Sequence, residues 1–203
     1  MRSTTPRDLE GHCKVCWLHQ EICLCDAIPR LMARTRIVIV RHVAELRLTS
    51  NTARFAALAL PGTQVLEYGG GPSFDDSEVA APGTALLYST APGAPSRPRL
   101  GPSPERLVVL DGSFRQTRRM YRRIEALRHL PELALPPPPV PPIRLRNPPR
   151  SDGMSTLEAI AHALALLEGP GLAEPLLALH DELVRRVDTR RGRLRDESGL
   201  PLS

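Results

Sequence analysis

The chain has 203 residues, a length typical of one domain or of one domain with a small appendage. No run of 18 apolar residues occurs, so we expect no transmembrane span. The net charge is +5, and 26 of the 27 basic residues are arginine, with Lys14 the one lysine. This excess predicts an anionic partner, nucleic acid before a membrane surface, although a GC-rich genome also favours arginine over lysine.

The first eight residues contain no apolar core of a secretory signal, and all four cysteines fall between Cys13 and Cys25. Such clustering is not typical of the disulfide framework of a secreted domain. We therefore expect a protein of the reducing cytoplasm.

The cysteine segment comes first along the chain. Four thiolates in a Cys-x2-Cys-x6-Cys-x-Cys pattern can close tetrahedrally on one structural Zn²⁺, with His12 or His19 as substitute ligands. Unligated thiols in an arm are the alternative, and an iron–sulfur cluster fits the spacing less well. The predicted ligands are Cys13, Cys16, Cys23 and Cys25. We assign residues 1–30 to this zinc-binding segment and 31–203 to a catalytic domain.

Strands and helices then alternate. Short β-branched or apolar runs predict strands at 37–40, 64–68, 84–88 and 106–110, with 143–145 as a candidate fifth. Helices are predicted at 54–60, 114–130, from a capping box at 155 to about 167, and at 172–190. Residues 133–142 hold six prolines and predict a stiff, extended connection. This alternation predicts an α/β fold with a mostly parallel sheet of five to six strands and flanking helices.

Ligands of parallel sheets bind beyond the carboxyl ends of the strands, which directs attention to Ser89, Asp111 and the residues after Leu145. Asp111 ends a predicted strand and precedes Gly112, which permits close approach of the backbone to a ligand. A carboxylate in this place suits a general base or a ligand-holding group. It also suits a simple cap of the next helix.

The helix after Asp111 carries arginines at i, i+3, i+4, i+7 and i+8, within an arc of about 140°. Like charges at these spacings destabilise a helix, so contact with phosphates would relieve them, whereas a solvated face is the alternative. These residues are Arg115, Arg118, Arg119, Arg122 and Arg123.

A second polar group follows the first predicted strand and by itself is typical of a solvated loop with a helix cap. It consists of His42, Glu45, Arg47, Thr49, Asn51 and Arg54. Further positive charge near the candidate fifth strand comes from Arg144, Arg146 and Arg150, each of which alone is typical of surface charge.

Taken together, in this order, these motifs resemble those of the DTW-domain family over about Cys13 to Leu167. The matching elements are the cysteine pattern, His42-x2-Glu45-x-Arg47-x-Thr49-Ser50-Asn51-Thr52, Leu86-Leu87-Tyr88, Asp111-Gly112-Ser113-Phe114-x-Gln116-x2-Arg119-Met120, and Leu145-Arg146 with Ser155-Thr156-Leu157-Glu158-Ala159-Ile160-Ala161. Ser113 and Phe114 stand where the family has Thr and Trp. Serine keeps the hydroxyl, and phenylalanine keeps a ring but loses the indole N–H.

The resemblance implies a relative of the SPOUT fold with a knotted C-terminal part. It implies transfer of the 3-amino-3-carboxypropyl group of S-adenosylmethionine to N3 of a tRNA uridine. Uridine N3 must lose a proton to become a good nucleophile, and Asp111 is the candidate base that accepts it. The expected S-adenosylmethionine site comprises Tyr88, Ser89, Leu110, Gly112, Ser113, Leu145, Ser155, Thr156 and Leu157. The expected tRNA site comprises His42, Glu45, Arg47, Asn51, Arg115, Arg118, Arg119, Arg122 and Arg146.

Other functions remain open at this point, since fold alone does not decide between methyl and aminocarboxypropyl transfer. An S-adenosylmethionine-dependent RNA methyltransferase and a non-catalytic, zinc-containing RNA-binding module are the two alternatives. A thiol redox protein is less favoured because no Cys-x-x-Cys begins a βαβ unit. The sequence leaves both a monomer and a homodimer open.

Overall fold

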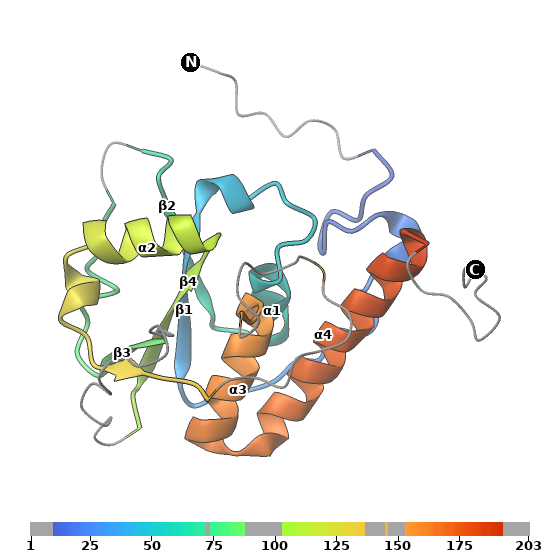
Figure 1. Ribbon diagram of the computed structural model, residues 1–203. Helices are drawn as coiled ribbons and strands as arrows, with labels where there is room; N and C mark the ends of the chain where they lie inside the picture. The colour runs from blue at the N-terminus through green and yellow to red at the C-terminus, as the bar shows by residue number, and fades with distance from the viewer. Residues whose placement is uncertain (1–9, 72–73, 88–102, 137–144, 146–152, 193–203) are drawn as a thin grey trace.

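Five parallel strands form the centre of the computed structural model, which describes residues 10–71, 74–87, 103–136, 145 and 153–192 (Figure 1). Their order across the sheet is β2-β1-β4-β3-β5. The strands are β1 (Arg36–His42), β2 (Gln64–Tyr68), β3 (Thr84–Leu87), β4 (Arg106–Asp111) and β5 (Glu132–Leu133). The predicted α/β class with a parallel sheet is confirmed.

Helices cover both faces of this sheet. They are α1 (Ala53–Ala59), α2 (Phe114–Arg123), α3 (Thr156–Glu168) and α4 (Pro170–Arg190), with short 3-10 turns η1 (Gln20–Ile22), η2 (Val43–Glu45) and η3 (Ala126–Arg128). Alternate side chains of β1 enter two cores because successive residues of a strand point to opposite faces. Ile37 and Ile39 pack in the core under α1, α3 and α4. Val38 and Val40 pack in the core under α2 and η3.

The carboxyl ends of β1 and β4 meet at the point where the chain changes direction across the sheet. From β1 the chain continues through α1 to β2 on one side, and from β4 it continues through α2 to β5 on the other. Adjacent strands whose connections diverge leave a crevice beyond their carboxyl ends. Asp111 lies there, paired in register with Arg41 of β1.

Two elements differ from the sequence-based prediction. The fifth strand is β5 rather than 143–145, since Leu145 lies in a bend and residues 143 and 144 fall outside the described chain. The helix after Asp111 ends at Arg123 because the backbone of Ile124 is extended, and its side chain is buried in the core beneath α2. The predicted knot stays a prediction, since the connection between Pro136 and Gly153 is described only at Leu145.

The cysteine segment packs against the rest of the chain. Cys16, Leu18 and Leu24 are buried in the same core as α1, α3 and α4. The Arg186 guanidinium on α4 donates a hydrogen bond to the carbonyl of Cys23. The division of the chain at residue 30 stays a prediction. No helix in the described ranges is both long enough and apolar enough to cross a membrane.

Candidate functional site

The four predicted metal ligands come together in one cluster. Their sulfur atoms all lie within 4.8 Å of one another. Cys13 and Cys25 approach to 3.5 Å, and Cys16 and Cys23 to 3.7 Å. Tetrahedral zinc with Zn–S bonds of about 2.3 Å separates its sulfur ligands by about 3.8 Å, so this donor set fits the ion.

The backbone around the first two cysteines stabilises the thiolate form of Cys13. N–H groups of Cys16 and Val15 point at the Cys13 sulfur and lower its pKa to about 6, while burial raises the pKa of Cys16. The chain turns back at Trp17, whose φ of 64° is unusual for a residue other than glycine. The turn is closed by hydrogen bonds between Cys13 and both Trp17 and Leu18.

Arg54 of α1 connects this segment to the loop after η2. Its guanidinium donates to the carbonyls of Cys16 and Leu46, each at 3.3 Å, and stacks 4.2 Å from the centre of the Trp17 ring. Burial, with Arg41 as a second cause, lowers its pKa to about 10. The predicted helix from Arg54 is present as α1, but its polar group taken by itself suggested a solvated position, whereas Arg54 is buried because its partners come from elsewhere in the fold.

A cavity of about 460 Å³, here called the main cavity, opens beyond the carboxyl ends of β1 and β4. This volume falls in the range of about 300–1,000 Å³ that small-molecule sites occupy. It is lined by Glu45, Ser50, Asn51, Thr52, Asp111, Gly112, Ser113, Phe114, Arg115, Leu145, Gly153, Met154, Ser155, Thr156, Glu158 and His180.

Asp111 is the buried carboxylate of the main cavity, with 4% of its surface exposed. Asn51 donates to Oδ2 at 2.6 Å, and the Thr156 hydroxyl donates to Oδ1 at 2.7 Å. These donors come from the segment before α1 and from the first residue of α3, 60 and 45 positions away along the chain. The fold therefore holds the carboxylate plane in one orientation.

Two opposing influences act on the proton affinity of Asp111. Burial raises its pKa, hydrogen bonds from Thr156 and Asn51 lower it, and the net direction is upward. The charge of Glu45 adds to the rise. An ionised Asp111 is therefore a stronger base than an exposed aspartate, which is the property that a proton acceptor requires.

Gly112 and Ser113 shape the wall next to Asp111. Ser113 caps α2 through a reciprocal capping box with Gln116. A Cβ on Gly112 would lie only 3.1 Å from the Gln116 Cβ and 3.2 Å from its Oε1, the atom that accepts from the Ser113 N–H. Glycine at this position therefore keeps the cap intact. The Ser113-x-x-Gln116 spacing could have revealed this box from the sequence.

The opposite wall contains a buried pair that the sequence did not predict. His180 of α4 is 4% exposed, and its Nε2 lies 3.4 Å from Oε2 of Glu158. The same carboxylate oxygen accepts from the backbone N–H of Ser155. His180 gives no local signal in the sequence, because a histidine within an amphipathic helix is an ordinary residue.

Of the predicted site residues, nine line the main cavity. They are Glu45, Asn51, Asp111, Gly112, Ser113, Arg115, Leu145, Ser155 and Thr156. Leu110 packs in the core beneath α2, and Leu157 is buried under α3. Arg47 is exposed, and the His42 imidazole accepts from the Ala44 N–H, both away from the lining. Tyr88, Ser89, Arg144, Arg146 and Arg150 lie outside the described residues.

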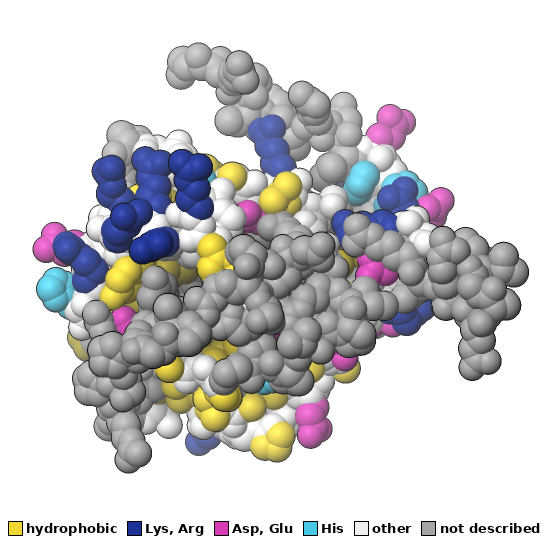
Figure 2. All heavy atoms as spheres, in the orientation of Figure 1, with side chains coloured by type: hydrophobic (Ala, Val, Ile, Leu, Met, Phe, Trp, Pro, Cys, Tyr) yellow, Lys and Arg dark blue, Asp and Glu magenta, His cyan; other side chains and the backbone are white. Residues whose placement is uncertain are grey.

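The residues of the arginine face of α2 are all exposed; we define this face as Arg115, Arg118, Arg119, Arg122 and Arg123. Figure 2 shows these basic side chains gathered over α2. No acidic residue within the described ranges forms an ion pair with them, and Arg122 donates a hydrogen bond to the backbone carbonyl of Arg118 on the same face. The predicted concentration of positive charge beside Asp111 is present.

The DTW domain matches residues 10–188. A protein of Drosophila melanogaster named tRNA-uridine aminocarboxypropyltransferase 2 is 28% identical over 186 residues, 86% of this chain and 74% of that protein. A Macaca fascicularis protein of the same name is 27% identical over 174 residues, so the match spans 80% of this chain and only 58% of the relative. No solved structure matches the chain.

Proposed function

The chain belongs to the DTW domain family, and from this membership and the buried carboxylate of the main cavity we propose that it modifies tRNA. In the proposed reaction it transfers the 3-amino-3-carboxypropyl group of S-adenosylmethionine to N3 of a tRNA uridine. The names of the two relatives support this activity. The orientation and raised pKa of Asp111 are the observation that carries the proposal.

Asp111 acts as the proton acceptor. Uridine N3 is a poor nucleophile until it loses its proton, which the ionised carboxylate accepts. The N3 electron pair then forms a bond to the methylene carbon next to the sulfonium. The carbon–sulfur bond breaks, its electrons return to sulfur, and neutral methylthioadenosine leaves. The chain contributes mainly the alignment of the two reactants.

Arg115 is the described arginine that lines the main cavity, and we assign it to the carboxylate of the transferred group. The start of α3 is less suitable for this role because three of its backbone N–H groups already donate to side chains. Ser155 donates to Glu158, Glu158 donates to Ser155, and Leu157 donates to Thr52. Leu145 supplies an apolar wall for the adenine.

The other four residues of the arginine face are exposed, do not line the main cavity and would contact tRNA phosphates; they are Arg118, Arg119, Arg122 and Arg123. Such contacts position a nucleic acid and carry no sequence information. The uridine to be modified would enter the cavity beyond the start of α2, where Ser113 and Phe114 line the opening.

The four cysteines would hold a structural zinc ion that fixes the segment carrying Trp17 against Arg54. Elemental analysis of the purified protein should find one zinc per chain. Cys23→Ser should lose the metal and lower the melting temperature. Retention of stoichiometric zinc by this variant would remove Cys23 from the ligand set.

Nucleoside mass spectrometry of tRNA from a strain lacking the gene tests the proposed reaction. One aminocarboxypropyluridine should disappear and return when the wild-type chain is expressed. In vitro, S-adenosylmethionine and that tRNA should yield methylthioadenosine. Release of S-adenosylhomocysteine instead would show methyl transfer, and an unchanged nucleoside profile would contradict tRNA modification.

A further inference from the structure

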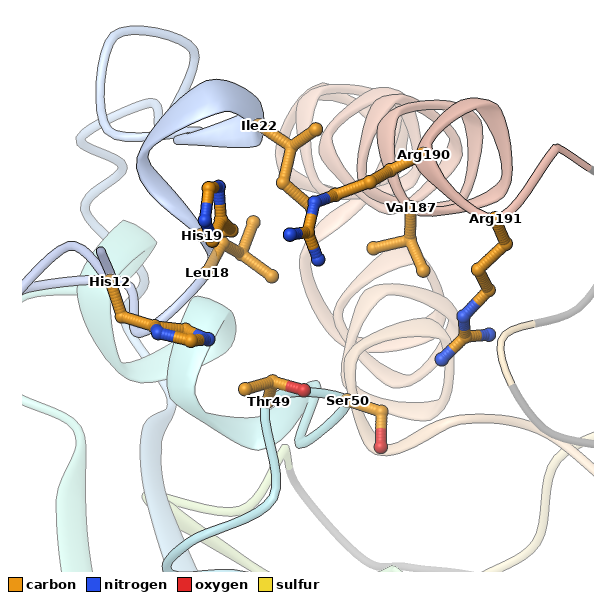
Figure 3. Close-up of a pocket in the computed structure, with 9 residues that line it drawn as sticks. All are labelled: His12, Leu18, His19, Ile22, Thr49, Ser50, Val187, Arg190 and Arg191. Atoms are coloured by element: carbon orange, nitrogen blue, oxygen red, sulfur yellow. The ribbon is translucent and has the colours of Figure 1, made fainter. Parts of the chain in front are cut away.

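A second pocket lies beside the main cavity and takes no part in the proposed chemistry. It measures about 110 Å³, well below the volume of sites for drug-sized molecules. Its lining comes from the cysteine segment, from the residues before α1 and from the end of α4 (Figure 3). The nine lining residues are His12, Leu18, His19, Ile22, Thr49, Ser50, Val187, Arg190 and Arg191.

The lining is chemically divided. Leu18 and Val187 are buried and apolar, with 2% and 8% of their surfaces exposed. The polar part offers two guanidinium groups, two imidazoles and two hydroxyls, and contains no carboxylate. In Figure 3 Arg190 and Arg191 approach from α4 on one side and His12 and His19 from the cysteine segment on the other. Guanidinium and hydroxyl donors around a small space suit the oxygens of one phosphate group.

The guanidiniums are positioned without a phosphate. Arg191 donates to the carbonyl of Leu145 at 3.2 Å and lies 3.9 Å from Asp188. Arg190 lies 3.5 Å from Glu21, a side chain that is 71% exposed and outside the lining. An exposed pair of this kind is weak, so a phosphate can compete with Glu21 for Arg190. Both arginines also offset the partial negative charge at the carboxyl end of α4.

Two contacts join the second pocket to the main cavity. Ser50 lines both spaces. Leu145, whose carbonyl holds Arg191, lines the main cavity. A group bound in the second pocket is therefore a close neighbour of whatever occupies the main cavity.

We propose that the second pocket binds a backbone phosphate of the RNA strand next to the uridine presented to Asp111. The phosphate class follows from the lining, whereas its RNA source rests on the proposed function. The subsite would fix the position of the strand on the side of the cysteine segment, away from the arginine face of α2.

Arg190→Gln and Arg191→Gln test the subsite, with Arg34→Gln as the matched control. Arg34 is likewise exposed and makes an ion pair at 3.5 Å, with the buried carboxylate of Glu168, and it precedes β1 at the amino ends of the strands, opposite the main cavity. All three variants lose one positive charge. We measure the affinity for tRNA purified from the deletion strain as a function of salt, with S-adenosylmethionine calorimetry and melting temperatures as controls for folding.

Each pocket variant should bind tRNA roughly tenfold more weakly than Arg34→Gln, the size of one lost charged hydrogen bond. Its salt slope should fall by about 0.7–0.9, the value for one phosphate. A pocket variant that matches Arg34→Gln in affinity and slope would overturn the proposal.

Competition distinguishes the source of the phosphate. Inorganic phosphate or uridine 5′-monophosphate, at constant ionic strength, should displace tRNA from the wild-type protein more readily than from Arg190→Gln. If Arg190→Gln weakens binding of the mononucleotide but leaves the salt dependence of tRNA affinity unchanged, the pocket binds a free nucleotide and the proposed RNA subsite is wrong. Pocket-dependent tRNA binding without formation of aminocarboxypropyluridine would instead refute the proposed function and leave the subsite standing.

Discussion

The carboxylate of Asp111 and the arginine face of α2 lie within one short stretch of chain, yet they differ in burial and in hydrogen bonding. Asp111 is buried and accepts two hydrogen bonds from distant segments. The five arginines are exposed and have no acidic partner within the described ranges. A buried charge interacts strongly with few groups, whereas an exposed charge interacts weakly with many. Substitutions at the two regions should therefore differ in size and in salt dependence.

The largest effect is expected from Asp111→Asn. Asparagine keeps the size of the side chain and one acceptor oxygen, but it replaces the second acceptor of the Asn51 and Thr156 hydrogen bonds with an amide donor. The Thr156 hydroxyl can rotate to accept from this amide, whereas the amide cannot accept the uridine proton at neutral pH. Turnover should fall by about 100-fold or more, while the affinities for S-adenosylmethionine and tRNA stay nearly unchanged. Single-turnover kinetics and calorimetry measure the two quantities. Unchanged turnover would remove Asp111 as the base.

Thr156→Val tests the buried site without removing its carboxylate, because it deletes only one hydrogen bond to Asp111. The loss should cost about 1–3 kcal/mol of stability, because a buried acceptor remains unsatisfied. It should also raise the pKa of Asp111, since this hydrogen bond lowers it. The acidic limb of the pH–rate profile should shift to higher pH. Thr117→Val, which removes an exposed hydroxyl bonded to the Phe114 carbonyl, is the control and should leave the limb in place.

The raised pKa of Asp111 also predicts how stability depends on pH. A group that binds its proton more tightly in the folded state contributes stability at low pH, which is lost as pH rises through the folded pKa. The wild-type protein should therefore lose this contribution as the pH rises from the ordinary range of an aspartate through the raised pKa of Asp111. Asp111→Asn should not, so its melting temperature relative to the wild type should increase across that window. A difference in melting temperature between the two proteins that stays constant with pH would show that the pKa of Asp111 is not raised by folding.

The sequence predicted those features whose signals are local. β-Branched runs such as 37–40 gave strands at nearly the observed bounds, because burial on both faces of a parallel strand requires them. The Ser155–Glu158 capping box is present as predicted. The four cysteines lie within 13 residues, and the turn at Trp17 brings their sulfur atoms together as predicted.

Features that depend on distant partners were missed or misjudged. β5 has only two residues and forms because the chain passes β3, and nothing in its composition indicates a strand. Asn51 was expected in the tRNA site and Arg54 at the start of a helix, and their polar group by itself suggested a solvated loop. Both side chains are buried, because Asp111 and the Cys16 carbonyl accept their hydrogen bonds. His180 reaches the main cavity from α4 through the packing of the last two helices.

The smallest effect is expected on the exposed side, from Arg118→Gln combined with Arg122→Gln. Each exposed arginine should contribute less than about 1 kcal/mol, or about fivefold in tRNA affinity. The salt slope should flatten by about 0.7–0.9 per lost phosphate contact, while turnover at saturating tRNA stays near the wild-type value. Arg30→Gln combined with Arg34→Gln removes the same charge from two exposed positions before β1 and controls for net charge. If the α2 variant and this control have equal salt slopes, the arginine face is only solvated. The tRNA strand then does not contact the surface of α2 next to Asp111. A flatter salt slope in the α2 variant than in this control, with turnover preserved, would show that the arginine face binds the tRNA strand and that Asp111 reacts with the base.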